Sequence, residues 1–347
     1  MWKTRRPLLG VLGLLVSSLM VWGPVLAAEG DRTLLAYRGH PTALTYTLTV
    51  KTSLKTLTHE GGDWRGTAVK KSHEDILGLG LEAKEGLDGL IDQTLTFTSI
   101  NGKTSALGLS PGAREGDVPI LWLKREEIVG KAQEIRMDLL GRVKDATGVP
   151  HFVSPGFHNR TSDGPPLDMY RVLLTMFPQF SLKRVSPGEQ WTVKDEAIVR
   201  DAKETPQGGP LDSTRSHKLE AKVKRDITYI HQGFVERGGY RTAVIGITGS
   251  YTIDAKGVEP NNGHYVKGNG KLSGEYYFAP TEGLVVEAAL KSKLNQSYTF
   301  DGLLVGYWMT PKERVSLILE DSTMPVVPWE GEQTIRLELA GSRAAAR

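Results

Sequence analysis

The sequence contains no cysteine among its 347 residues. Secreted eukaryotic domains usually contain disulfides, so this absence favours a bacterial envelope protein. It also removes the residue to which a bacterial lipoprotein attaches its lipid. The chain further lacks a P-loop, a Rossmann fingerprint and an H-E-x-x-H zinc motif, which argues against the commonest motif-bearing enzymes. We therefore expect no cofactor.

The chain also has no net excess of positive or negative charge when its first six residues are left out of the count. The chain has 43 basic and 40 acidic residues. Three of the basic residues, Lys3, Arg5 and Arg6, lie at the very start, so 40 basic residues remain against 40 acidic ones. Because proteins that bind nucleic acid or anionic membranes normally carry a basic excess, we expect no nucleic-acid partner.

Residues 1–28 have the pattern of a secretory signal peptide. A basic start is followed by an uncharged stretch, Pro7–Ala28, that ends in small residues. An uncleaved membrane anchor is the alternative, but Pro24 and the small residues favour cleavage. Arg5-Arg6 also resembles a twin-arginine signal, so the export route stays open. We expect a periplasmic or secreted protein without stable membrane insertion after cleavage.

Apolar and polar residues alternate with period two through much of the chain. Leu44, Tyr46, Leu48 and Val50 alternate with threonines, a pattern typical of antiparallel sheets with one wet face. The predicted fold class is mainly β: a large curved antiparallel sheet or half-barrel with one short helix on its apolar face. The expected organisation is a β region at 29–147, a linker, helix and long loop at 148–216, a β region at 217–340 and a disordered tail at 341–347.

The spacing of apolar residues predicts a helix in one segment. Tyr170, Leu173, Leu174 and Phe177 follow the spacing i, i+3, i+4, i+7, and Pro178 ends the pattern because the residue before proline avoids the α region. A helix over Leu167–Phe177 is too short to stand alone, so we expect it to pack on the sheet.

Turn residues separate the strands. The pairs Asn101-Gly102, Gly238-Gly239 and Asp301-Gly302 predict hairpin turns, because Asn, Asp and Gly tolerate the positive φ that such turns require. Pro280–Gly283 predicts another, and Ser-Pro-Gly at Ser186–Gly188 predicts a tight turn.

Two sequence patterns resemble a catalytic site and a metal site, and each also has a purely structural interpretation. Gly108–Gly112 matches the hydrolase pattern G-x-S-x-G around Ser110, but that motif needs a helix directly after it, and none is predicted. His151, His158 and Asp163 could ligate zinc. Their spacing fits no helix or strand face and no further ligand is evident, so we predict no metal site.

An apolar surface is the better candidate for a ligand site. Trp191 follows a turn, where a tryptophan either closes the end of a β core or lines a ligand cavity. The methionines and aromatics of the predicted helix allow the same two interpretations. The predicted ligand-binding residues are Tyr170, Leu173, Met176, Phe177 and Trp191.

The stretches Val185–Trp191 and Tyr276–Gly283 resemble a class of uncharacterised bacterial secreted β-rich proteins. That class is in turn similar to the periplasmic lipoprotein-carrier fold of the LolA and LppX type. The resemblance implies a curved sheet, open on one side, whose helices cover an apolar concavity that accepts lipid.

These observations predict a non-catalytic periplasmic binding or carrier-like protein for an apolar or amphipathic ligand, such as a lipid. Two alternatives stay open. One is a structural or assembly protein of the bacterial envelope, with an envelope protein as partner. The other is a hydrolase with an unrecognised site, which would depend on Ser110 or His158.

Overall fold

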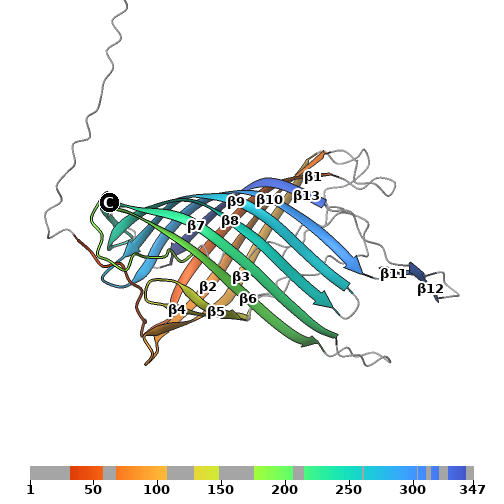
Figure 1. Ribbon diagram of the computed structural model, residues 1–347, viewed down its shortest axis with the longest axis horizontal. Coiled ribbons are helices and arrows are strands. Elements are labelled where there is room, and N and C mark those ends of the chain that lie inside the picture. Colours follow the sequence, from red (N-terminus) through yellow and green to blue (C-terminus); the bar gives the residue numbers. More distant parts are fainter. Residues whose placement is uncertain are drawn as a thin grey trace, which may run out of the picture.

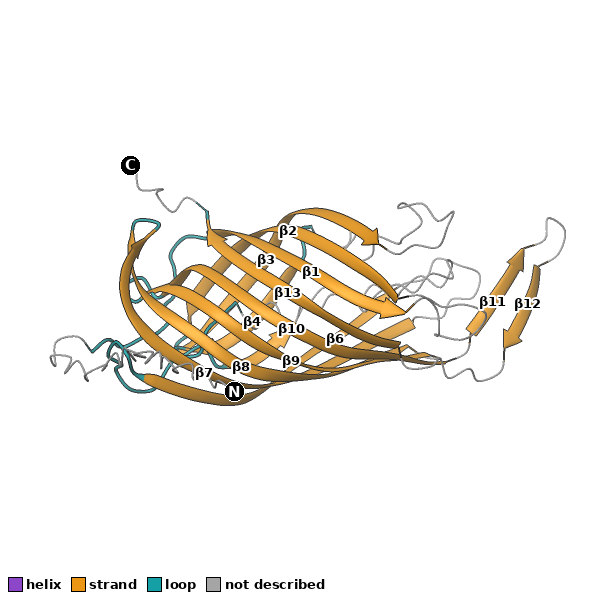
Figure 2. Ribbon diagram, turned by 90° about the horizontal axis from the view of Figure 1, so that it is seen from above, coloured by secondary structure: helices purple, strands orange, loops and turns teal. Residues whose placement is uncertain are grey.

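The computed structural model describes residues 32–57, 68–107, 129–147, 176–205, 215–259, 262–302, 304–309, 314–319 and 327–340. Its wall is one antiparallel sheet of eleven strands in the order β5-β4-β3-β2-β1-β13-β10-β9-β8-β7-β6 (Figure 1). The strands are long and run obliquely, as Figure 2 shows. A separate two-stranded sheet, β11-β12, lies beyond one end of the wall.

The strands of the wall are β1 (Leu44–Leu57), β2 (Ala68–Glu85), β3 (Leu90–Leu107), β4 (Ala132–Asp138), β5 (Val143–Thr147), β6 (Gln190–Thr205), β7 (Arg215–Arg237), β8 (Tyr240–Glu259), β9 (Asn262–Ala279), β10 (Leu284–Gly302) and β13 (Val327–Leu339). The small sheet consists of β11 (Leu304–Met309) and β12 (Arg314–Leu319).

Alternation along each strand assigns one face to the interior. In β1, Tyr46, Leu48 and Val50 are buried while Lys51 is exposed. In β4 the burial pattern alternates along all seven residues. A period of two places successive side chains on opposite faces of a sheet, so the apolar set lines the interior and the polar set points outward. The predicted mainly β fold and large antiparallel sheet are confirmed.

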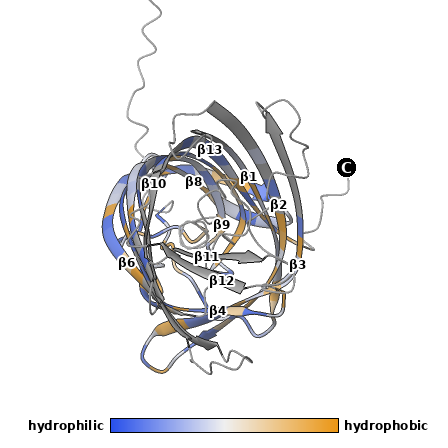
Figure 3. Ribbon diagram, turned by 90° about the vertical axis from the view of Figure 1, so that its right-hand side faces the viewer, coloured by the Kyte–Doolittle hydropathy of each residue, from blue (hydrophilic) through white to orange (hydrophobic). Residues whose placement is uncertain are grey.

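The sheet curls into a nearly closed barrel. The two edge strands, β5 and β6, lie beside each other, and Figure 3 shows the strands as a ring when viewed along the barrel. No ladder pairs β5 with β6 among the described residues. The wall therefore goes further than the predicted half-barrel, because the twist and tilt of eleven paired strands bring the two edges together.

Short turns connect the strands at one end of the barrel, which we call the short-turn end. Gly238 and Gly239 both have positive φ, 59° and 83°, and Pro280–Gly283 forms the turn between β9 and β10. Both turns were predicted. The predicted turn at Asn101-Gly102 is wrong: both residues lie inside β3, with Asn101 opposite Ile76 of β2.

Most connections at the opposite end are longer, although β8 and β9 are joined through residues 260–261 alone. Among the longer ones, β1 and β2 are joined through residues 58–67, and β6 and β7 through residues 206–214. The barrel therefore has two unlike ends.

The predicted helix falls almost wholly on residues outside the description. Its last two residues, Met176 and Phe177, are described; they lie in a turn and a bend, and both are buried. Across the described ranges, no helix has the length and apolar character that crossing a membrane requires.

Candidate functional site: the plugged lumen

Two segments close the short-turn end of the lumen, and we call residues 33–40 and 176–186 together the plug. The segments pair with each other, because Thr33 and Val185 exchange backbone hydrogen bonds of 3.0 and 2.9 Å. The Tyr37 hydroxyl donates to the Pro178 carbonyl over 3.0 Å. The backbone N–H of Tyr37 also donates to Leu139, in the turn between β4 and β5.

Aromatic rings fill the space between the plug and the wall. The ring of Phe180 lies 5.1 Å from that of Tyr37 and 4.4 Å from that of Phe278 on β9. Phe180 and Phe278 are both fully buried. Because Tyr37 also contacts the turn between β4 and β5, the plug joins two separate parts of the wall and closes the lumen here.

Gln179 is held by three side chains of the wall. Its backbone N–H donates to the Tyr229 hydroxyl over 3.3 Å. Its carbonyl accepts from the indole N–H of Trp191 over 2.8 Å, and its side-chain Nε2 donates to Asp195 over 2.6 Å. We call this set of contacts the Gln179 clamp. It fixes the plug to β6 and β7.

A buried ion pair supports the clamp. The Arg225 guanidinium donates to both Asp195 carboxylate oxygens, over 3.0 Å from Nε and 2.5 Å from Nη2. The side chain of Arg225 is only 3% exposed and that of Asp195 20%. Burying a lone guanidinium is costly, and the hydrogen bonds and the charge of Asp195 offset that cost.

Sequence reasoning anticipated only part of this site. Met176 and Phe177 lie in the plug, and Trp191 stacks on Tyr229 with ring centroids 5.4 Å apart. Tyr170 and Leu173, like the alternative catalytic residues Ser110 and His158 and the candidate metal ligands His151 and Asp163, lie outside the described residues.

The clamp itself was missed, although one signal could have found its ion pair. Arg225 occupies an inward position between the buried residues Val223 and Ile227. A charged residue at such a position needs a partner, because burying an unpaired charge is costly. Gln179 gives no comparable signal, since it lies in an irregular segment without periodicity.

Other buried polar groups face the lumen. Gln333 of β13 donates to Thr52 of β1 over 3.0 Å, and Tyr251 of β8 lies 3.0 Å from the hydroxyl of Ser292 on β10. Gln333 and Thr52 belong to neighbouring strands, whereas Tyr251 reaches Ser292 across β9, and none of these four side chains carries a charge.

Three carboxamide atoms in the lumen lack partners. Gln93 of β3 and Gln133 of β4 are 3% and 0% exposed. Oε1 of Gln93 and both Oε1 and Nε2 of Gln133 have no hydrogen bond. Each buried polar group left without a hydrogen bond costs about 1–3 kcal/mol of stability. These two residues therefore destabilise the fold unless a hydrogen-bonding partner is present.

A second buried side chain without partners is His231 of β7. It is fully buried, its ring packs edge-on against Phe234 at 4.9 Å, and neither ring nitrogen has a hydrogen bond. Among the described residues, no three His, Asp or Glu side chains gather as metal ligands.

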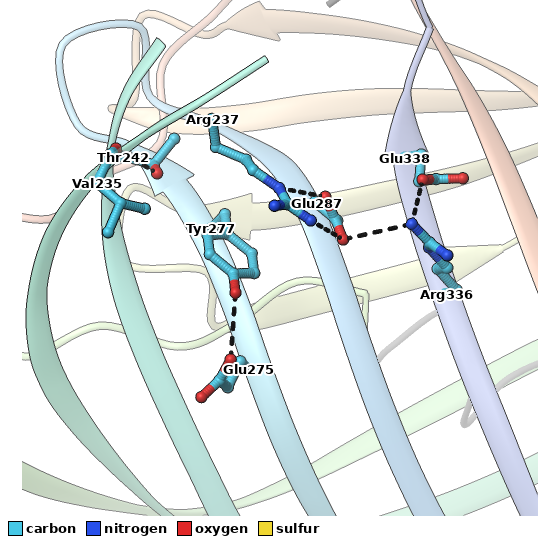
Figure 4. A network of polar contacts seen from close by, with 8 residues as sticks. All are labelled: Val235, Arg237, Thr242, Glu275, Tyr277, Glu287, Arg336 and Glu338. Carbon is cyan, nitrogen blue, oxygen red and sulfur yellow. Dashed lines mark hydrogen bonds and ion pairs between the residues drawn. The ribbon is translucent and has the colours of Figure 1, made fainter. Parts of the chain in front are cut away.

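The outward face of the described wall is charged. Figure 4 shows one network on it: Glu287 of β10 accepts two hydrogen bonds from Arg237, of 2.7 and 2.8 Å, and Arg336 of β13 lies between Glu287 and Glu338. Similar outward side chains line the other strands, including Lys51, Glu134, Lys194, Glu196, Lys224, Asp254 and Lys271.

These outward charges restrict the surroundings of the wall. A Lys or Arg on the lipid face of a barrel costs about 2–4 kcal/mol at the bilayer midplane. Outer-membrane barrels accordingly present an apolar band there, whereas this wall has its apolar side chains inside. Outward charged positions such as Lys271 and Lys224 are therefore more stable in water, headgroups or protein than among acyl chains.

No protein-family model and no curated protein matches the chain. Among solved structures, an outer membrane channel from Pseudomonas putida F1 matches with a TM-score of 0.23 and 8% identity, over 89% of this chain and 99% of that one. OmpF of Salmonella typhi, in complex with daunomycin, matches with a TM-score of 0.21 and 7% identity, over 84% and 97%. A mutant porin of Rh. blastica matches with a TM-score of 0.17 and 8% identity, over 84% of this chain and 98% of that one.

These findings correct the carrier prediction. The matches are an outer membrane channel and porins rather than carriers of the LolA and LppX type, and the wall is a nearly closed barrel rather than an open sheet under helices. The predicted carrier-like function, its lipid or envelope-protein partner, the periplasmic or secreted location and the exclusion of stable membrane insertion were wrong by this comparison.

Proposed function

We propose that the chain forms a channel-type β-barrel that passes solutes across the bacterial outer membrane, closed by its plug in the state described. The observation that carries this proposal is the nearly closed wall of eleven strands around a lumen whose end is blocked by a separately held segment. Larger outer-membrane barrels, of about 22 strands, have a plugged lumen and serve transport.

The unlike ends of the barrel support the proposal. Outer-membrane barrels have short turns on the periplasmic side and longer connections outside. By the same arrangement, the short-turn end with the plug would face the periplasm. The signal peptide predicted at residues 1–28 would bring the chain there, and we propose that role for it.

The strands are much longer than a bilayer requires, which makes the outward charges compatible with the proposal. A strand needs about 9–11 residues to cross a bilayer, whereas β7 has 23 residues, roughly 75 Å at about 3.3 Å per residue. A strand of that length extends well beyond the acyl chains even when tilted, so part of its charged outward face can stand outside them.

The sequence-predicted residues receive a new role under this proposal. We propose that Met176 and Phe177 form part of the plug and that Trp191 holds it through Gln179. Tyr170 and Leu173 would lie in the segment that leads into the plug. None of the five would be a lipid contact.

Two measurements test the function. The first is fractionation of the native envelope: the protein should sediment with outer membranes and resist a carbonate wash. The second is solute-driven swelling of liposomes that contain the purified chain. Permeation should be slow for the native protein and at least tenfold faster for Phe180→Ala, which removes the ring between plug and wall.

A matched control is Lys271→Ala, on the outward face of β9, the strand that carries Phe278. It should leave the swelling rate unchanged. Recovery of the protein entirely in the soluble fraction, or liposomes that stay impermeable with Phe180→Ala, would show that the chain is not a channel.

A further inference from the structure

A groove lies on the outward face of the wall across β7, β8, β9 and β10, four neighbouring strands (Figure 1). Its volume is about 570 Å³, within the range of about 300–1,000 Å³ that is usual for small-molecule sites. Thr252 and Asp254 of β8 lie in its middle. The side chains on either side of them are Lys222 and Lys224 of β7, Lys267 and Asn269 of β9 and Asn295 of β10.

Lysines outnumber carboxylates in this groove. Lys222 and Lys224 share the carboxylate of Glu196, at 3.6 and 3.2 Å, and Asp254 stands between Lys222 and Lys267 in the ladders of β8. The groove itself is lined by three lysines and one carboxylate. The outward network of Figure 4, by contrast, joins two arginines to two glutamates and leaves no surplus.

The surplus of lysine continues beside the groove. Lys271 of β9 stands directly opposite Lys293 of β10, and Lys291 is a diagonal neighbour of Lys271. All three are exposed, and across the residues that the structure describes none of them has an ion pair. Like charges directly opposite each other destabilise a sheet, so an anion held nearby lowers the repulsion.

The surrounding carboxylates do not cancel this charge. Asp226 pairs with Lys194 at 2.9 Å, and Glu220 stands opposite Lys256. The outward charges that remain at the groove and beside it are six lysines and four carboxylates: Lys222, Lys224, Lys267, Lys271, Lys291 and Lys293, and Glu196, Asp254, Glu330 and Glu332. The groove is therefore a local concentration of positive charge on a chain that is nearly balanced as a whole.

The side chains of the groove specify the chemistry of a ligand. A lysine binds phosphate as a point charge, and several lysines together suit an anion with more than one charge, as a phosphate monoester has. Asn269, Asn295 and Thr252 offer donors and acceptors, and Asp254 offers acceptors. These groups complement the hydroxyls of a sugar.

We propose that the groove binds a phosphorylated saccharide, with Lys222, Lys224 and Lys267 on the phosphate and the asparagines on the sugar hydroxyls. Such a group occurs in soluble sugar phosphates and in the headgroups of phosphorylated glycolipids. The inference goes beyond the proposed transport and does not depend on it, because the groove lies outside the wall rather than in the lumen.

Equilibrium binding to the purified full chain in a neutral detergent tests the groove. The probe is glucose 6-phosphate, and glucose and glucuronate serve as its uncharged and singly charged counterparts. The native chain should bind the phosphate about tenfold more tightly than either, the usual effect of one charge-assisted hydrogen bond. Binding should weaken as salt rises, because salt screens exposed charges.

Two variants locate the binding. Lys224→Gln and Lys267→Gln should each weaken binding of glucose 6-phosphate about tenfold, with an unchanged urea midpoint, because exposed ion pairs contribute little to stability. Lys84→Gln is the matched control. Lys84 is exposed on the outward face of β2, which β1 and β13 separate from β10, so its loss should leave binding unchanged.

A second arm separates the two sources of the ligand. Lipid A, which carries a phosphorylated disaccharide on acyl chains, replaces the sugar phosphate in the same detergent. Tighter binding of lipid A than of glucose 6-phosphate, weakened by Lys224→Gln, would assign the groove to a glycolipid headgroup. The reverse order of affinity would assign it to a soluble sugar phosphate.

The proposal is overturned if the native chain binds neither phosphorylated probe, if glucuronate binds as tightly as glucose 6-phosphate, or if the groove variants bind no more weakly than Lys84→Gln. Liposome swelling without any of this binding would remove the groove site and leave the channel standing. Binding without swelling would do the reverse.

Discussion

The Asp195–Arg225 pair offers the sharpest test of how the plug is held. Asp195 accepts two hydrogen bonds from Arg225 and one from Gln179. In Asp195→Asn the amide group has nearly the same shape, but it loses the charge and turns an NH₂ donor toward the guanidinium. The arginine, 3% exposed, is then buried without its carboxylate.

Removing one partner of a buried ion pair costs about 3–5 kcal/mol. We therefore expect Asp195→Asn to lower the free energy of unfolding by about that much, measured from urea denaturation followed by tryptophan fluorescence. The double variant Asp195→Asn with Arg225→Met removes both charges. It should lie within about 1–2 kcal/mol of the native protein, because replacing a whole buried pair by apolar groups is often neutral or better.

Glu196→Gln is the matched control. Glu196 follows Asp195 in β6 but faces outward, where it pairs with Lys222 and Lys224 at 3.6 and 3.2 Å. Its loss should leave the urea midpoint within error, since exposed ion pairs contribute little. If Asp195→Asn behaves like this control, or if the double variant loses as much as the two single variants together, the clamp does not work as described.

Three further predictions concern stability. Phe180→Ala should lower the free energy of unfolding by about 3–5 kcal/mol, because it opens a cavity beside Phe278; a loss below about 1 kcal/mol would mean that the plug is not packed on the wall. His231→Leu should keep or raise the free energy of unfolding, because it replaces two buried nitrogens without hydrogen bonds by an apolar side chain; a loss above about 2 kcal/mol would show that the ring nitrogens are paired. Glu287→Gln should cost about 1 kcal/mol at low salt, since its partner Arg237 is partly exposed, and the difference should shrink in 1 M salt as charge screening increases; a salt-independent difference would argue against an ionic contribution.

The sheet was predictable because strand periodicity is local. Residues 44–50 alternate so regularly that the inward set follows from the sequence, and the inward set is the buried one. The turn at Gly238-Gly239 was equally predictable from the sequence, since glycine readily adopts the positive φ angles that both residues have. Asn101-Gly102 is an equally favourable turn pair but lies inside a ladder, where pairing of β3 with β2 outweighs the local turn preference.

Closure of the barrel and the plug could not be read in the same way. Closure depends on how eleven strands pair and tilt together, and no single strand carries that information. The plug is held by contacts between residues far apart in the chain, such as Tyr37 with Pro178. Its residues follow no period, so the sequence identifies apolar candidates such as Met176 and Phe177 but not the polar clamp around Gln179.

The outward direction of the polar face is the feature that most constrains function. Periodicity states which residues share a face, but it does not state whether the apolar face lines a lumen or meets lipid. In this barrel the burial of Leu48, Leu290 and Leu337 places the apolar face inside. That arrangement makes the lumen, rather than the outer surface, the place where selectivity would reside.

Cysteine labelling in the native envelope tests the central claim most directly, because the chain has no cysteine of its own. Lys194→Cys and Lys271→Cys point outward, whereas Leu290→Cys lies in the lumen, where Leu290 is 2% exposed. A water-soluble maleimide admitted to both sides of the outer membrane should label both outward cysteines and leave the lumen cysteine unlabelled until Phe180→Ala loosens the plug. Protection of the outward cysteines together with rapid labelling of Leu290→Cys would contradict both the orientation of the wall and its closure by the plug.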